Sequence, residues 1–189
     1  MIFEKSVDIP VSMEEAWAFM MDIPAVSRCV PGVVSMEAVD QDAYTGIMNV
    51  KVGAIRISFR GRLDVIARDA AARRAALRVQ GDDKRIGAAM RATVEMSLEP
   101  RSMNAVALHV RSEAAVLGKL GELGQAVMLR KADQIVTEFA QNMAHALGGG
   151  SGTMAEVTVP ATRTGRVPNR FTRWLWSVLR RQRARLPKS

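Results

Sequence analysis

"AIRISFRGRLDVIARD", residues 54–69, is the stretch of sequence that decides the fold. Apolar and polar side chains alternate along it. One parity carries Ile55, Ile57, Phe59, Leu63, Val65 and Ala67, and the other carries Arg56, Ser58, Arg60, Arg62, Asp64 and Arg68. A period of two residues is typical of an antiparallel strand with one face in the core and the other in water. We therefore predict such a strand here, with arginines on its outer face.

The same alternation recurs on both sides of this strand. It is found around residues 48–52, 75–79, 90–98 and 106–110, and residues 1–9 also have the character of a strand. Turn-forming sequences separate these segments, among them "DQD" at 40, "KVG" at 51 and "GDDKRIG" at 81. The pattern predicts a run of antiparallel strands joined by short turns.

A short helix is predicted directly after the first strand. Ser12 and Glu15 have the spacing of a capping box, and the helix that they open should end near Met21. Trp17 and Met20 should face inward, and the prolines of "DIPAVSRCVPG" (residues 22–32) should then leave at most one further helical turn.

The period changes to that of a helix after Glu113. Apolar residues from Leu120 to Leu147 recur at spacings of three and four, which predicts one long amphipathic helix, stopped by Gly148. Glycines 118, 121 and 124 should leave an opening at its start. A curved antiparallel sheet wrapped around this helix, an α+β architecture over residues 1–147, is the fold class that the order of elements predicts.

Charge divides the chain into two parts. The net charge of the whole chain is +8, yet residues 1–147 hold 18 basic and 18 acidic residues, whereas residues 148–189 hold nine basic residues and only Glu156. Residues 148–168 are rich in Gly, Thr and Pro, which is typical of a flexible linker. The basic character therefore belongs to the tail, residues 169–189, and the domain itself is neutral.

The tail has the pattern of an amphipathic helix lying in a membrane interface. Tryptophans border an apolar stripe and arginines lie opposite, and this arrangement suits an anionic bilayer surface. The residues that we expect to bind the membrane are Phe171, Arg173, Trp174, Leu175, Trp176, Val178, Leu179, Arg180 and Arg181. The stripe could instead dock into a groove on a protein partner or on the domain itself. Nucleic acid is disfavoured because the domain is neutral and phosphate binding needs no tryptophans.

The chain is expected to be cytoplasmic and peripherally associated with the inner face of the cell membrane. Its first ten residues lack the apolar region of a signal peptide, and Cys29 alone cannot form a disulfide within the chain. No stretch approaches the ~20 apolar residues that a membrane-spanning helix needs.

A ligand cavity between sheet and long helix is a further expectation. Twelve methionines accompany only five phenylalanines, three tryptophans and one tyrosine, so the interior has flexible side chains and few large rings to fill it. Simple core filling is the other interpretation. The residues that we expect to line the cavity are Met48, Ile57, Phe59, Met90, Val94, Met96, Leu117, Leu120, Met128 and Ile135.

Residues suited to catalysis are scarce. His109 has the outward parity of its strand, His145 lies in the last turn of the long helix, and Cys29 has no neighbours at zinc-ligand spacing. We predict neither a catalytic residue nor a metal site. Arg56, Arg60 and Arg62 are either an ordinary solvated face or a docking patch for an acidic partner.

The order of elements resembles the helix-grip fold of the START-like (SRPBCC) superfamily. Within it, residues 29–65, "CVPGVVSMEAVDQDAYTGIMNVKVGAIRISFRGRLDV", resemble the G-subunit family of carbon monoxide dehydrogenase, which has a Cys-x-Pro-Gly motif, a "KVG" turn and the pattern "FxGxxxV", here Phe59, Gly61 and Val65. Residues 118–147, "GKLGELGQAVMLRKADQIVTEFAQNMAHAL", resemble the family's glycine-spaced entry into its last helix.

The resemblance implies an accessory protein rather than an enzyme. Members of the family help attach a molybdenum hydroxylase of the carbon monoxide dehydrogenase type to the cytoplasmic membrane. The fold suits a hydrophobic small molecule, with menaquinone or another isoprenoid quinone as the expected guest and no metal or covalent cofactor. The alternatives are an enzyme of the same superfamily, a general carrier of lipids without a hydroxylase partner, and a recruiter with a filled core.

Overall fold

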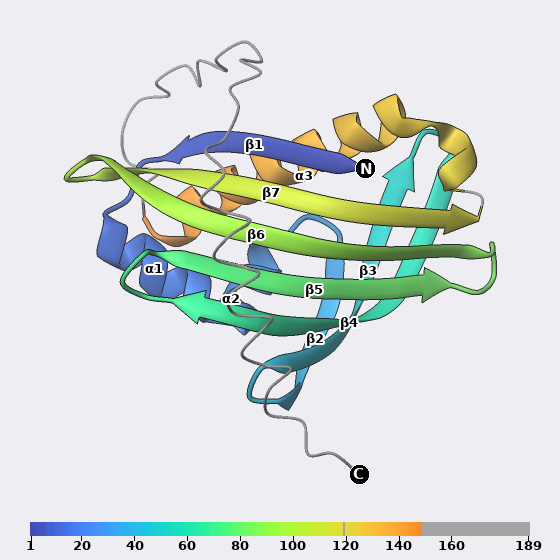
Figure 1. Ribbon diagram of the computed structural model, residues 1–189, viewed down its shortest axis with the longest axis horizontal. Helices are drawn as coiled ribbons and strands as arrows, with labels where there is room; N and C mark the ends of the chain where they lie inside the picture. The colour runs from blue at the N-terminus through green and yellow to red at the C-terminus, as the bar shows by residue number, and fades with distance from the viewer. Residues whose placement is uncertain (119, 149–189) are drawn as a thin grey trace, which may run out of the picture. The chain divides into compact units, whose positions relative to one another are not determined.

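The computed structural model describes residues 1–118 and 120–148, which form one curved antiparallel sheet and its helices (Figure 1). The sheet has seven strands in the order β1-β7-β6-β5-β4-β3-β2. The strands are β1 (Ile2–Ile9), β2 (Val33–Asp40), β3 (Ala43–Val52), β4 (Ile55–Asp69), β5 (Arg74–Asp83), β6 (Ala88–Ser102) and β7 (Ala105–Gly118). Each pair of consecutive strands from β2 to β7 forms a hairpin. β1 pairs with β7 and forms one edge of the sheet, and β2 forms the other edge.

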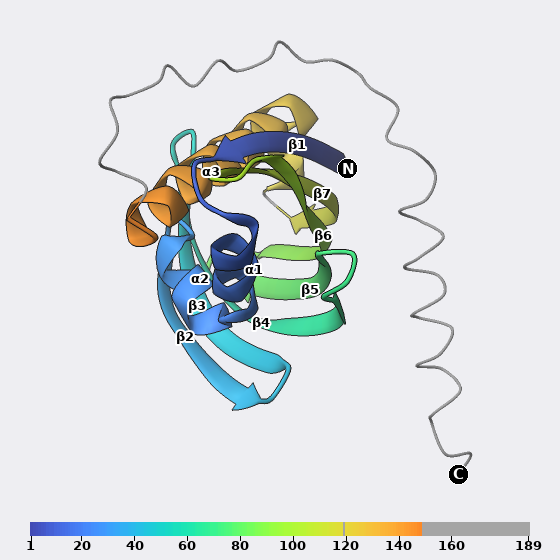
Figure 2. The ribbon, with the colours of Figure 1, turned by 90° about the vertical axis from the view of Figure 1, so that its left-hand side faces the viewer.

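The helices lie on the concave side of the sheet. They are α1 (Met13–Met21), α2 (Ile23–Cys29), a 3-10 turn at Gly121–Leu123 and α3 (Gln125–Ala146). Figure 2 shows the sheet curving around α1 and α2, while α3 passes beside β1. The predicted architecture, a curved sheet around one long helix, is confirmed. Among the described residues, no helix is both long enough and apolar enough to cross a membrane.

The capping box at the start of α1 is confirmed. The Ser12 hydroxyl accepts a hydrogen bond from the Glu15 amide, and the Glu15 carboxylate accepts one from the Ser12 amide at 3.1 Å. The Ser12 hydroxyl also donates to this carboxylate at 2.6 Å. The two bonds that Ser12 donates, that from its hydroxyl first and that from its amide second, hold the pKa of Glu15 below its ordinary value. The helix α2 is longer than the single turn that we expected, because Pro24 lies in its first turn, where a missing amide hydrogen costs nothing.

A β-bulge corrects the predicted faces of β4. Val65 pairs with Leu77 and Ala67 with Ala76, so Ile66 is the extra residue. Ile66 is buried, and Ala67 moves to the outer face together with Ala76. The prediction that Ala67 shares the inner face with Val65 is therefore wrong. Upstream of the bulge, the predicted parity of the strand holds.

The strand β7 is longer than predicted, and the long helix begins later. Residues 114–118 continue the strand in register with β6, although we expected the change of period after Glu113. Gly118 and Gly124 have positive φ angles of 69° and 81° and stand on either side of the 3-10 turn. Because left-handed backbone suits glycine, these two residues turn the chain from β7 into α3.

The hydrophobic core consists of two separate clusters. The helix-end cluster lies under α1, α2 and the second half of α3 and includes Ile9, Val11, Met20, Leu98, Val106, Leu108, Phe139 and Met143. The hairpin-end cluster lies by the β3–β4 and β5–β6 turns and consists of Val52, Ile57, Phe59, Ala88 and Leu120. The part of the inner face between the two clusters is the candidate binding site.

Candidate functional site: the space between sheet and long helix

A row of glycines crosses the inner face of the sheet between the two clusters. Gly46 pairs with Gly61 and Gly61 with Gly81, and the row continues to Met90. A Cβ atom on Gly61 would lie 2.2 Å from the carbonyl oxygen of Gln80, closer than real contacts allow. Glycine is therefore required where β4 and β5 approach each other, and the three glycines add no side chains to the interior.

In the next row towards the helix-end cluster, the side chains on β6 and β7 are also small. Leu63 pairs with Val79, Val79 with Ala92, and Ala92 with Ala114. We call Gly46, Gly61, Gly81, Ala92 and Ala114 the interior floor. Bulky side chains fill both ends of the inner face, whereas the interior floor between them carries no side chain larger than a methyl group. The middle of the inner face therefore has smaller side chains, at these five positions, than its two ends.

The helix α3 covers the floor without burying its own apolar side fully. Its buried residues are Phe139, Ala140 and Met143, all in its second half. The apolar side chains of its first half are only half-buried, namely Val127, Met128, Leu129, Ala132, Ile135 and Val136. α3 packs mainly against β1 and α2, and to a lesser extent against β3. The first half of α3 therefore has apolar surface that the middle strands do not cover.

Polar contacts hold α3 at one edge of the sheet. The Lys5 ammonium donates to the Asp133 carboxylate at 2.6 Å, to the Asp133 carbonyl at 3.3 Å and to the Thr137 hydroxyl at 2.6 Å. The Asn142 amide donates to the Cys29 carbonyl at 2.9 Å. Because all three donors of Lys5 have partners, its charge is satisfied and the interior stays apolar.

Most of the predicted lining residues lie on the inner face. Ile57, Phe59, Met96 and Leu120 are buried, and Met48, Met90, Val94, Met128 and Ile135 are half-buried. Leu117 is a correction: it is 58% exposed and pairs with Ala89 on the outer face. The reason is that residues 114–118 remain a strand, in which Val116 faces inward and Leu117 outward. The predicted membrane-binding residues of the tail lie outside the described residues.

The interior floor could not be recognised in the sequence. Gly46, Gly61, Gly81, Ala92 and Ala114 come from five different segments, and nothing in the local pattern aligns them. The available signal is their parity, since each alternates with an outward polar neighbour such as Arg60 or Gln80. Only the register between strands brings the small residues side by side.

The residues with chemical reactivity lie away from the interior floor. Burial raises the pKa of the Cys29 thiol, which disfavours the nucleophilic thiolate. Nε2 of His109 lies 3.1 Å from a Glu99 carboxylate oxygen on the outer side of the sheet, and His145 is exposed at the end of α3. In the described ranges, no three potential metal-ligating side chains come together.

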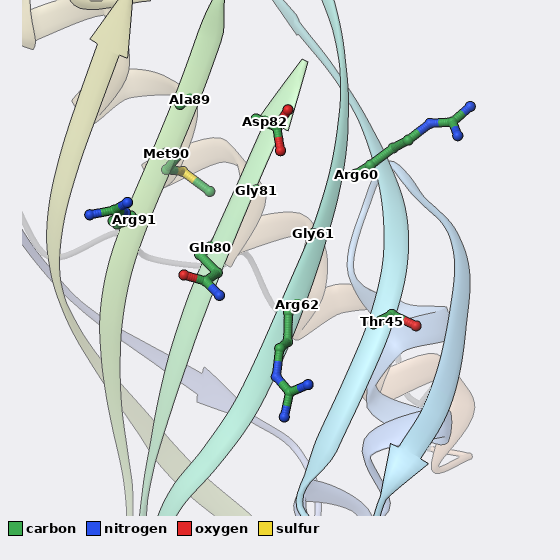
Figure 3. A pocket seen from close by; sticks show the side chains of 10 residues that line it. All are labelled: Thr45, Arg60, Gly61, Arg62, Gln80, Gly81, Asp82, Ala89, Met90 and Arg91. Carbon is green, nitrogen blue, oxygen red and sulfur yellow. The ribbon is translucent and has the colours of Figure 1, made fainter. Parts of the chain in front are cut away.

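Two hollows lie on the outer face of the sheet. One, of about 360 Å³, surrounds the backbone of Gly61 and Gly81 (Figure 3), and the other, of about 400 Å³, lies beside it between β4 and β5. They share Arg60 and Asp82. Arg60 and Arg62 point outward from β4, as predicted.

Asp83 joins β4 to β5 where the two strands part. Their ladder ends at Arg60 and Asp82, and one carboxylate oxygen of Asp83 then accepts from the Ser58 amide at 2.9 Å. The other accepts from the Arg85 amide at 3.1 Å. These hydrogen bonds, that from Ser58 first, hold the pKa of Asp83 below its ordinary value. An ionised Asp83 therefore closes the hairpin end of the sheet at neutral pH.

The fold and its apolar interior define a helix-grip protein of the START-like class. Solved structures share this fold. A conserved protein from Geobacillus kaustophilus has a TM-score of 0.71 at 20% identity, with 79% of this chain and 96% of that chain covered. A START superfamily protein from Mycobacterium smegmatis has a TM-score of 0.57 at 11% identity, covering 78% and 97%.

The chain belongs to the CoxG family, the G subunit of carbon monoxide dehydrogenase, whose sequence profile matches residues 6–148. The resemblance seen in the sequence is thereby confirmed. The Zhui aromatase/cyclase from Streptomyces sp. R1128 also has the fold, with a TM-score of 0.58, 13% identity and coverage of 78% and 93%. No curated protein sequence is similar enough to count as a relative.

Proposed function

We propose that this protein is a non-enzymatic carrier that holds an isoprenoid quinone such as menaquinone between the sheet and α3. The observation that carries the proposal is the interior floor, whose five residues are glycine or alanine between two filled clusters, together with the half-buried apolar side chains in the first half of α3. Apolar surface left uncovered inside a protein gains free energy, about 25 cal/mol per Å², when a ligand covers it. A long apolar molecule suits this lining better than a charged one.

The second part of the proposal is recruitment to the membrane. Membership of the CoxG family implies association with carbon monoxide dehydrogenase, and we propose that the partner is a molybdenum hydroxylase of that type. The basic tail would hold the complex at the anionic inner face of the cell membrane, where quinones dissolve. The carrier would then pass its guest between the bilayer and the enzyme that supplies electrons.

Native mass spectrometry of the protein purified from membranes tests the carrier role. The expected result is a stoichiometric guest that organic extraction identifies as an isoprenoid quinone. A protein that carries no apolar guest, and that binds no menaquinone in a fluorescence titration, contradicts the carrier role.

A matched pair of variants places the guest. Ala114 and Ala115 are neighbours on β7, and Ala114 belongs to the interior floor while Ala115 is exposed on the outer face beside Arg91. Ala114→Leu should fill the space and reduce the bound quinone severalfold, whereas Ala115→Leu should leave it unchanged. If both variants retain the same amount of quinone and both are folded by circular dichroism, the guest does not lie above the floor.

A further inference from the structure

The two hollows on the outer face adjoin at Arg60 and Asp82, and we call the two together the outer groove. Its floor is the backbone of Gly61 and Gly81, and Arg60 and Asp82 border both of its halves. The side chains around it are Thr45, Ser58, Arg62, Gln80, Asp83, Lys84 and Arg91. In Figure 3 the Arg62, Gln80 and Arg91 side chains come from three different strands around the two glycines.

A polar row crosses the groove from β3 to β6. Thr45 pairs with Arg62, Arg62 with Gln80, and Gln80 with Arg91. Neighbouring strands lie about 4.8 Å apart, so the Cα atoms of Arg62 and Arg91, two strands apart, are separated by roughly 10 Å. The row therefore presents two arginines whose Cα atoms are held at this spacing, with the amide of Gln80 between them.

The arginines of the groove have free hydrogen-bonding capacity. Among residues 1–118 and 120–148, Arg60 and Arg91 have no hydrogen-bond or ion-pair partner for their guanidinium groups. Arg62 donates from Nε to Asp64 at 2.7 Å, which leaves its two terminal nitrogens available. A guanidinium with unused donors binds carboxylates through paired hydrogen bonds.

We propose that the outer groove docks an acidic segment of a partner protein. Two carboxylates in a polyproline-II conformation repeat every three residues and lie about 9 Å apart on one face, which matches the spacing of Arg62 and Arg91. A third carboxylate reaches Arg60, and Gln80 hydrogen-bonds the peptide backbone between them. The groove thus recognises an extended segment with an acidic residue at every third position.

The geometry disfavours the other anionic partners. A bilayer surface is broad and does not enter a groove in the middle of a sheet. A nucleic acid carries a phosphate at every nucleotide, and some of its phosphates would meet Asp82 and Asp83, which line the second hollow together with Arg60 and Lys84. A protein segment can place an uncharged residue at these positions. The proposal concerns the opposite face of the sheet from the quinone site, so its failure leaves the carrier role intact.

Binding of a labelled peptide to the full chain tests the proposal. The probe is a fluorescent peptide in which glutamate recurs every third residue between prolines, and its control has glutamine in place of glutamate. At about 0.15 M salt, distant charges are largely screened. The glutamate peptide should bind and the glutamine peptide should not. Amide signals of Gly61 and Gly81 should shift in the ¹⁵N–¹H NMR spectrum.

Two double variants with the same change of charge provide the decisive comparison. R60Q/R91Q should weaken peptide binding about tenfold or more, because charge-assisted hydrogen bonds are lost. R28Q/R130Q removes two exposed arginines on α2 and α3 and should change it less than about threefold. Should R60Q/R91Q fold poorly, Gln80→Glu places a negative charge in the groove and should abolish binding instead.

Three results would overturn the proposal. The first is equal weakening by both double variants, which would show that only net charge matters. The second is an unchanged NMR signal of Gly61 and Gly81 while residues 149–189 shift, which would place the peptide on the basic tail. The third is an unaltered peptide affinity in R60Q/R91Q together with weaker binding to vesicles of anionic lipid, which would make the groove a lipid contact.

Discussion

The close approach of β4 and β5 at Gly61 can be tested by adding a single methyl group. In Gly61→Ala the new Cβ would lie 2.2 Å from the carbonyl oxygen of Gln80 and 2.9 Å from the Cα atom of Gly81. Both are backbone atoms, which no rotamer change can move away. The two strands must therefore separate by roughly 1 Å to reach ordinary carbon contacts of about 3.5 Å.

The expected loss of stability follows from this movement. Overpacking costs about 1–3 kcal/mol, and weakening the adjacent ladder hydrogen bonds adds about 1 kcal/mol. The lower entropy of the unfolded chain with alanine returns about 0.4–1 kcal/mol. We expect a net loss of about 2 kcal/mol for Gly61→Ala, which corresponds to a melting temperature lower by about 4–8 °C.

Gly81→Ala is the matched control. Gly81 is the direct cross-strand partner of Gly61, yet a Cβ there would meet its nearest atom, the carbonyl oxygen of Arg60, at 3.3 Å. A shift of a few tenths of an ångström relieves this contact. The stability of Gly81→Ala should therefore stay within about 1 kcal/mol of the parent protein.

Urea denaturation followed by circular dichroism measures both variants on the full chain. The chemical change is the same at the two sites, so the difference between the variants reports the local geometry. If Gly61→Ala is as stable as Gly81→Ala to within about 0.5 kcal/mol, β4 and β5 are not pressed together at this pair. The requirement for glycine in the interior floor would then be refuted.

Three further predictions concern an ion pair, a buried acid and the tail. Lys5→Met removes every polar bond between β1 and α3 that this side chain makes and should lower the free energy of unfolding by about 1–3 kcal/mol in urea denaturation. Burial raises the pKa of Glu95, so its folded form holds a proton more tightly than the unfolded chain and stability falls as pH rises above the ordinary carboxyl pKa. Glu95→Gln should accordingly be more stable than the parent at pH 7 and equal to it near pH 4, and a parent that is at least as stable as the variant at pH 7 would contradict the sign. The triple substitution R173Q/R180Q/R181Q should weaken binding to anionic vesicles by about 3 kcal/mol, or roughly a hundredfold, and unchanged sedimentation would exclude the tail as the anchor.

The faces of the strands could be predicted wherever the alternation was unbroken. The parity of Ile55 to Val65 is clear from the sequence, and the structure keeps it because one face of the sheet meets the core. The bulge at Ile66 could not be predicted, since a single extra residue leaves no local mark when its neighbours are Val65 and Ala67. An apolar side chain fits either face at that point, and only the pairing with β5 decides.

The prediction of the boundary between β7 and α3 was wrong for a related reason. Residues 114–118, "AAVLG", suit a helix as well as a strand, and the sequence offers no polar alternation to separate the two. Pairing with β6 decides the outcome, and it turns Leu117 outward. The predicted lining residues on clearly alternating strands, such as Phe59 and Met96, lie on the expected face. Leu117 does not, because no polar residue follows Glu113 in the strand to mark its outer face.

The glycine row connects the proposed binding sites on the two faces of the sheet. It lets β4 and β5 approach each other, which leaves the inner face without side chains above Gly61 and Gly81. The same two residues form the floor of the outer groove, because a strand of alternating parity places Arg60 and Arg62 on either side of Gly61. A partner bound in the groove would therefore rest against the backbone that also lines the quinone space. Only the thickness of one strand would separate the two proposed ligands.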